Sequence, residues 1–350
     1  MGWCSRQGLT RRTLLAAAVT PVVARALPPR GAQAAQTSAD VLETSQVHLG
    51  TNVSLRVLPA AGQPREVVHN AMAAAWAEFE RVGRLTSATG SDSDVARINA
   101  AAGSASVVVS AEVFALVQRC LEFSAYSGGV FDVTYAALSG LWRFEGDQPT
   151  APPDPREVKR LRALIDYRRV VMDPARSAIM LPSAGMRLGL GGVARGYAVD
   201  CAARVLTGTG VQAFVIRAGG VTLGEGRFPW APLRMAVPDP RVPARPLASV
   251  EIKDGALAWV GDHERFFVVG GKRYHHIIDP RTGYPAGASR LAAVLAKSAV
   301  DADWLTKAVF ILGLKDGEQV LQRVGAQALV MTTEGKVEMT EGMRRRTELL

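Results

Sequence analysis

Cysteine is scarce in this sequence, with three residues in 350. Cys4 lies near the N-terminus, and Cys120 and Cys201 each fall on an apolar pattern with helical spacing. The chain has no Cys-x-x-Cys pair and no cluster of histidines, which excludes the usual zinc, haem and thiol-redox motifs. We expect Cys120 and Cys201 to be buried structural residues rather than a disulfide or a reactive thiol.

An excess of one charge is also missing beyond the N-terminus. The net charge is +9, but residues 1–34 hold five arginines and no acid, so 36 basic and 32 acidic residues remain and the balance falls to +4. The basic residues are scattered, without the basic face and interleaved aromatics of nucleic-acid-binding proteins. We therefore expect no nucleic-acid partner. A hydrophobic fraction of 48% indicates a folded domain with a sizeable core.

A long hydrophobic run is missing as well. The apolar stretch Leu14–Ala24 is too short to span a bilayer as a permanent helix. It follows the pair Arg11-Arg12 and precedes Ala32–Ala34, a small-x-small pattern typical of signal cleavage. We predict that residues 1–34 are a twin-arginine export signal and that the mature protein is periplasmic. A chance basic N-terminus and an uncleaved anchor are the alternatives.

The rest of the chain mixes the periodicities of helices and strands. We expect a single compact α+β domain with a mostly antiparallel sheet and packed helices, as one body or as two lobes around a cleft. A short helix capped by Ser93 or Asp94 and a Pro-rich insert at 146–160 interrupt the longer elements. Strands are predicted over 47–58 and repeatedly over 213–278, and helices over 65–84, 111–127, 194–206 and 301–313.

The segment LGLGGVARG places four glycines around Arg195, just before a predicted helix. Backbone N–H groups at such a turn can approach a phosphate, and the helix N-terminus and Arg195 add positive charge. The spacing matches neither a Walker loop nor G-x-G-x-x-G, because residue 194 is Ala. A tight turn without a ligand explains the pattern equally well.

The segment HHIIDPRTG combines a turn with two histidines. The run from Asp279 to Gly283 is typical turn chemistry. A structural turn does not require His275 and His276 ahead of it, and a histidine beside an aspartate can accept the proton of a hydroxyl nucleophile. A purely structural turn is the alternative.

The segment DADWLTK begins a predicted helix with Asp301, Asp303 and Thr306. Residues three or four apart share a helix face, so Asp303 and Thr306 point the same way. Two side-chain oxygens and a backbone carbonyl suit Mg²⁺, which prefers oxygen ligands. The alternative is that the acids only stabilise the positive end of the helix dipole.

Six ordered segments together resemble the ApbE-like flavin transferases, the FAD:protein FMN transferases. The resemblance covers about 45–335, and it identifies 45–340 as a flavin transferase domain with a flavin-binding cleft, followed by a basic C-terminal tail at 341–350. The segments are LGTNVSL, SDSDVARIN, SGGVFDVTYAALSGLWRF, GGVARGYAVD, HHIIDPRTG and DADWLTKAVFILG.

The resemblance implies the chemistry and the residues that carry it. FAD is the substrate, Mg²⁺ assists cleavage of its pyrophosphate, FMN passes to a Thr or Ser hydroxyl of a target flavoprotein, and AMP leaves. His276 is the implied base for the hydroxyl, and Asp279 and Arg281 hold the turn. The implied cofactor-binding residues are Leu49, Thr89, Val130, Phe131, Asp132, Gly189, Gly191, Arg195 and Ile277. The implied metal-binding residues are Gly192, Asp303 and Thr306.

The chain also departs from the family pattern. The most consequential departure is Lys307, at the position of a family Thr that binds metal. Thr306 could substitute from the neighbouring position, or Lys307 could place an ammonium where Mg²⁺ would bind. The alternatives to a transferase are therefore a non-catalytic FAD-binding carrier or assembly factor, and an FAD pyrophosphatase. The other departures are Gly189 for an Asp, Arg195 for a Lys, Val221 for an acid, Trp259-Val260 for a Thr-Ser pair and Thr89 for an aromatic.

Overall fold

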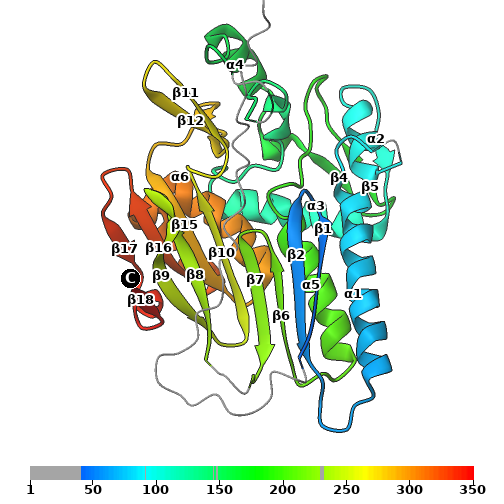
Figure 1. Ribbon diagram of the computed structural model, residues 1–350. Helices are drawn as coiled ribbons and strands as arrows, with labels where there is room; N and C mark the ends of the chain where they lie inside the picture. Colours follow the sequence, from blue (N-terminus) through cyan, green and yellow to red (C-terminus); the bar gives the residue numbers. More distant parts are fainter. Residues whose placement is uncertain (1–40, 91, 145, 147–148, 229–231) are drawn as a thin grey trace, which may run out of the picture.

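The computed structural model describes residues 41–90, 92–144, 146, 149–228 and 232–350. An eight-stranded antiparallel sheet forms its centre, in the order β1-β2-β6-β7-β10-β15-β16-β17 (Figure 1). This sheet confirms the predicted α+β fold with mostly antiparallel pairing. Its strands are β1 (Leu42–His48), β2 (Thr51–Leu58), β6 (Ala213–Ala218), β7 (Val221–Gly226), β10 (Gly255–Gly261), β15 (Ser289–Ala296), β16 (Gln327–Thr332) and β17 (Val337–Met339).

Side chains along each strand alternate between the two faces of the sheet, and those on one face pack against three helices. In β10, Ala256 and Ala258 point to the helices, whereas Leu257 points to the opposite face. The helices are α1 (Arg65–Thr86), α5 (Ala194–Gly208) and α6 (Ala299–Val324), and they lie on one side of the sheet in Figure 1. All three were predicted from their periodicity, and a left-handed φ of 76° at Gly313 breaks α6 at the predicted stop.

A second, smaller sheet packs on the opposite face. Its strand order is β18-β9-β8, and its side chains share an apolar cluster with β10, β15 and β16. The region 341–350, expected as a tail, belongs to this layer, since Met343 is fully buried and the last strand pairs with β9. The elements are β8 (Leu233–Asp239), β9 (Val242–Ile252), α7 (Glu341–Arg344) and β18 (Thr347–Leu349).

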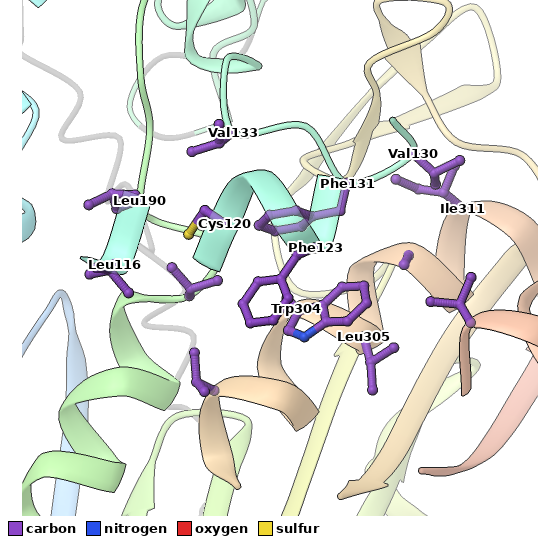
Figure 2. Close-up of a cluster of buried hydrophobic side chains, with 14 of the residues drawn as sticks. Leu116, Cys120, Phe123, Val130, Phe131, Val133, Leu190, Trp304, Leu305 and Ile311 are labelled. Carbon is purple, nitrogen blue, oxygen red and sulfur yellow. The ribbon is translucent and has the colours of Figure 1, made fainter. Parts of the chain in front are cut away.

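The remaining helices and the short strands pack together against α6. Figure 2 shows the core that joins them, where the ring of Phe123 stacks on Trp304 of α6 at 4.6 Å between centroids and Phe131 meets Trp304 edge-on. The Ser93 side chain caps α2, as predicted, by accepting a hydrogen bond from the N–H of Ala96. The elements are α2 (Asp94–Ala100), β3 (Val107–Val108), α3 (Ala111–Tyr126), η1 (Ala136–Leu138), η2 (Tyr167–Arg169), β4 (Val171–Asp173) and β5 (Ala178–Met180).

Two predicted segments differ from the structure. The strand predicted over 47–58 is a hairpin, because Leu49 and Gly50 adopt φ values of 50° and 70° and reverse the chain between β1 and β2. Leucine rarely adopts a positive φ, so the sequence carries no turn signal there beyond one glycine. The Pro-rich insert contains α4 (Pro155–Arg162), whose N-terminus is capped by Asp154.

Short hairpins complete the end of the molecule where α4 lies (Figure 1). The strands β11 (Phe266–Val269) and β12 (Lys272–His275) pair through a Gly270-Gly271 turn, and β13 (Ile278–Asp279) pairs with β14 (Tyr284–Pro285). Cys120 and Cys201 are buried and form no disulfide, as predicted. Among the described residues, no helix is long and apolar enough to cross a membrane. The predicted export signal at 1–34 lies outside the described residues.

Candidate functional site

Two turns of the main sheet and the end of one strand meet at one of its edges. Val53 near the start of β2 pairs with Ala218 at the end of β6, and Val221 at the start of β7 pairs with Ala258 in β10. The β1–β2 turn, the β6–β7 turn and the end of β10 therefore lie at the same end of their strands. The first turns of α5, which carry Arg195, reach the same edge, since an Nη of Arg195 lies 3.5 Å from a Cβ placed on Gly219 in the β6–β7 turn.

The predicted glycine loop lies against aromatic side chains. The N–H of Gly189 donates to the carbonyl of Val133, and a Cβ placed on Gly189 would lie 3.0 Å from the ring of Tyr135. A Cβ on Gly191 would lie 3.2 Å from the Tyr135 hydroxyl, and one on Gly192 would lie 3.0 Å from the Phe131 ring. These glycines thus lie so close to the aromatic rings that a larger side chain would crowd them.

Arg195 supplies positive charge beside this loop. It lies in the first turn of α5, where the partial charge of the helix end is also positive. Its Nε is buried and has no hydrogen-bond partner among the described residues. A buried, unsatisfied guanidinium nitrogen is costly, so its position favours a bound anion.

His276 directly follows β12 and is held by its backbone rather than by its ring. Its N–H donates to the carbonyl of Arg265, whereas its Nδ1 is buried without a hydrogen-bond partner among the described residues. Burial first, and then the positive charges of Arg265 and Arg195, lower the pKa of His276 to about 3. The imidazole is therefore neutral at physiological pH and has a nitrogen available to accept a proton.

The side chains of the rest of the HHIIDPRTG segment make contacts within the protein. The predicted role of Ile277 in cofactor binding stays a prediction. The Nε2 of His275 donates to the carbonyl of Ala286, and its Nδ1 accepts from the N–H of Ile277. Ile277 is itself buried in the main core. Asp279 accepts two side-chain hydrogen bonds from Arg281, at 2.9 and 2.7 Å, as the predicted turn-holding role requires.

Two of the three predicted metal-binding residues, Asp303 and Thr306, contact each other and Lys307. The predicted role of Gly192 stays a prediction. The ammonium of Lys307 contacts Asp303 Oδ1 and lies 2.7 Å from the Asp303 carbonyl oxygen. Asp303 Oδ2 accepts the N–H of Gly196 at 3.0 Å, and the Thr306 hydroxyl donates to the same carbonyl at 2.7 Å. Within the described residues, no group of three or more His, Cys, Asp or Glu could hold a metal ion. In this arrangement Asp303 and Thr306 do not fit Mg²⁺, because the ammonium of Lys307 already contacts the Asp303 carboxylate.

Two of the predicted cofactor residues lie at the hairpin turn and the Ser-rich loop. Leu49 lines a cleft of about 860 Å³ together with Ser87, Gly90 and Ser93. Thr89 is exposed in the same loop, where its N–H donates to Ser87 Oγ. Leu49 stands two residues before Thr51, whose hydroxyl lies against Gly219, so the cleft begins close to the sheet edge that carries Arg195.

Three more of the predicted cofactor residues, Val130, Phe131 and Asp132, have buried side chains. Val130 and Phe131 belong to the core shown in Figure 2. Asp132 accepts hydrogen bonds from the N–H and hydroxyl of Thr134 and from the N–H of Tyr167, while burial raises its pKa. The role of this segment in cofactor binding stays a prediction.

Sequence reasoning did not single out Arg265 or Glu264. Both precede β11, and the β11–β12 hairpin brings Arg265 beside His276, which follows β12. Glu264 accepts from the N–H of Gly261 at the end of β10. The only signal in the sequence was a charged pair between two apolar strands, and that pattern is common on protein surfaces.

Comparison with known proteins gives one consistent result. The ApbE family model matches residues 49–330. A Treponema pallidum protein named FAD:protein FMN transferase is 32% identical, covering 89% of this chain and 91% of its own length. A Klebsiella pneumoniae protein of the same name is 31% identical, covering 77% and 84%.

Solved structures agree with the sequence comparison. An ApbE protein from Thermotoga maritima superposes with a TM-score of 0.78 at 30% identity, covering 87% of this chain and 99% of its own. The flavinyl transferase ApbE of Pseudomonas stutzeri, in its apo form, superposes with a TM-score of 0.75 at 28% identity, covering 87% and 96%.

Proposed function

Since the chain belongs to the ApbE family, we propose that it is an enzyme that transfers FMN from FAD to a protein. The observation that carries the proposal is the neutral ring of His276, with an unpartnered Nδ1, beside the positive charges of Arg265 and Arg195. A diphosphate ester is an anion that needs such positive charge, and a hydroxyl nucleophile needs a proton acceptor. FAD and a protein hydroxyl together account for both.

The finer reaction is a displacement at phosphorus. The oxygen of a Thr or Ser in the target flavoprotein bonds to the phosphorus of the FMN half of FAD. The bond from that phosphorus to the bridging oxygen breaks, and AMP leaves with the electron pair. The hydroxyl proton passes to Nδ1 of His276.

Bound FAD would also prepare His276 for this role. Part of the lowering of the pKa of His276 comes from Arg265 and Arg195. A diphosphate placed between these groups offsets their charge and moves the pKa back toward its ordinary value. The base would therefore gain strength when the substrate is in place.

Two further features belong to this proposal. The Mg²⁺ that the resemblance implies would have to displace Lys307 from Asp303, so the proposed reaction has no metal step. Export to the periplasm rests on the twin-arginine pattern of residues 1–34 and places the target flavoprotein outside the cytoplasm.

The test is mass spectrometry of an acceptor flavoprotein after incubation with the chain and FAD, with and without Mg²⁺. We expect a Thr or Ser of the acceptor to gain the mass of FMN. His276→Gln should slow the gain by about 10²–10⁴-fold. The matched control is His69→Gln, the same change at an exposed histidine of α1, which should keep the wild-type rate.

Other outcomes would identify the alternatives. Release of FMN and AMP without an adduct on several acceptors would indicate an FAD pyrophosphatase. Intact FAD retained by the chain for hours, without an adduct, would indicate a binding protein. Equal rates for wild type and His276→Gln would remove His276 from the mechanism.

A further inference from the structure

The buried pair of Asp303 and Lys307 is the main disagreement between this chain and the metal chemistry that the resemblance implies. Lys307 lies one helical turn after Asp303 in α6 and contacts both its carboxylate and its carbonyl oxygen. The exposed fraction is 1% for the Asp303 side chain and 18% for the Lys307 side chain. Asp303 is therefore shielded from water, while Lys307 still reaches the surface of the site.

Asp303 has no unused oxygen to offer a metal ion. The ammonium of Lys307 contacts Oδ1, and the N–H of Gly196 donates to Oδ2. The Lys307 ammonium and the Thr306 hydroxyl both donate to the backbone carbonyl oxygen. Mg²⁺ needs near-octahedral oxygen ligands at about 2.0–2.1 Å, and an ammonium group supplies none. Thr306 does not supply the missing ligand either, because it is fully buried and donates its hydroxyl hydrogen to Asp303.

The ammonium of Lys307 nevertheless brings a positive charge close to the glycine loop, where a bound diphosphate would need one. Lys307 is close enough to Arg195 for the two charges to affect each other, and Asp303 connects it to the first turn of α5 through Gly196. The N-terminus of α5, Arg195 and Lys307 therefore gather on one side of the glycine loop. A lysine ammonium acts as a compact point charge toward phosphate, as in other phosphate-binding loops.

We propose that the ammonium of Lys307 takes the place of the divalent cation beside the diphosphate of FAD, so that this chain binds FAD without Mg²⁺. The inference rests on the proposed function, because FAD is the ligand in both. It adds that the cation is part of the polypeptide and that Asp303 positions Lys307 instead of ligating a metal.

The first test compares FAD affinity by quenching of flavin fluorescence in EDTA and in millimolar Mg²⁺. For the wild-type chain we expect the two dissociation constants to agree within about twofold, because the cation is part of the polypeptide and does not depend on added metal. A tenfold or greater loss of affinity in EDTA, restored by Mg²⁺, would overturn the inference while leaving the proposed function intact. No binding of FAD in either condition would overturn the proposed function and the inference with it.

The second test restores the residue type of the family pattern. Lys307→Thr removes the ammonium and frees Asp303, so its FAD affinity should fall by tenfold or more in EDTA and recover in Mg²⁺. Its melting temperature without FAD should also rise on addition of Mg²⁺, whereas that of the wild type should not, because only the variant has an unpaired buried carboxylate.

The matched control is Lys315→Thr, the same substitution at an exposed lysine of the same helix. It should behave as the wild type in both tests. A wild-type melting temperature that rises on addition of Mg²⁺ would show that the ion displaces Lys307. This result would refute the inference from the wild-type chain alone.

Discussion

At the scale of single residues, His276 combines the expected role of a base with a pKa of about 3. Burial is the largest cause, and the charges of Arg265 and Arg195 add to it. A histidine that is protonated in the unfolded chain but not in the folded one makes stability depend on pH. The dependence gives a test of the ring's environment that needs neither substrate nor acceptor.

We expect the free energy of unfolding to fall as the pH drops from about 6.5 towards 3. The ordinary pKa of histidine is about 6.5, so in this window the unfolded chain binds a proton at His276 that the folded chain does not. Stability is therefore fully present above this window and is lost as the pH falls through it. His276→Gln should lose less stability than the wild type between pH 6 and pH 4, by about 2–2.5 kcal/mol. Urea denaturation at both pH values measures the difference, and parallel losses would show that the ring is not held neutral.

The contacts of some single residues could be predicted from the sequence, and those of others could not. The structural roles of Asp279 and Arg281 follow from turn chemistry, and the structure confirms them. The engagement of Asp303 by Lys307 was one of two alternatives, because residues four apart on a helix can meet but need not. The proximity of Arg265 to His276 depends on how the β11–β12 hairpin pairs, which no local pattern specifies.

At the scale of elements, the site depends on how closely α5 approaches α6. Asp200 of α5 accepts the N–H groups of Ala299 and Val300 at the start of α6, at 2.8 and 2.9 Å. Burial raises the pKa of Asp200 to about 6. One turn earlier in α5, Gly196 donates to Asp303. The two contacts fix the helix that carries Arg195 against the helix that carries Lys307.

The close approach of the helices requires glycine at position 196. A Cβ there would lie 2.4 Å from the carbonyl oxygen of Ala299, which is backbone and cannot rotate away. Gly196→Ala should therefore destabilise the fold by about 1–3 kcal/mol and weaken FAD binding as the helices separate. The control is Gly208→Ala in the same helix, where a Cβ meets no atom within 4 Å, and the change should be neutral or stabilising. Equal denaturation midpoints for the two variants would contradict this account of the interface.

Elements with a strong period were predictable, and those set by tertiary contacts were not. The helix α1 lies within two residues of its predicted bounds because its apolar stripe is unambiguous. The β1–β2 hairpin was missed because Leu49 adopts a positive φ without a residue type that favours it. The helix α4 was missed because proline and charge dominate its segment, although Asp154 before Pro155 is a recognisable helix start.

At the scale of the whole molecule, the main sheet is covered on both faces. One face packs on α1, α5 and α6, and the other packs on β8, β9 and Met343 of α7. The candidate site lies at the edge of the main sheet where the β1–β2 and β6–β7 turns meet. It includes residues between positions 49 and 307 of the sequence. Segments far apart in the chain must therefore be folded together before the site exists, so the site depends on global stability.

Residues 341–350 give the sharpest test of this dependence, because the sequence predicted a basic C-terminal tail, whereas the segment packs as part of the fold. Met343 is fully buried, and β18 pairs with β9 through Thr347, Glu348 and Leu349. Deleting the segment should lower the free energy of unfolding by more than the about 2–5 kcal/mol expected for Met343→Ala alone, because β9 also loses its partner strand. Urea denaturation followed by circular dichroism compares both variants with the wild type. An unchanged midpoint for the deletion would restore the tail interpretation, whereas equal losses in the two variants would assign the whole contribution to Met343 and none to β18.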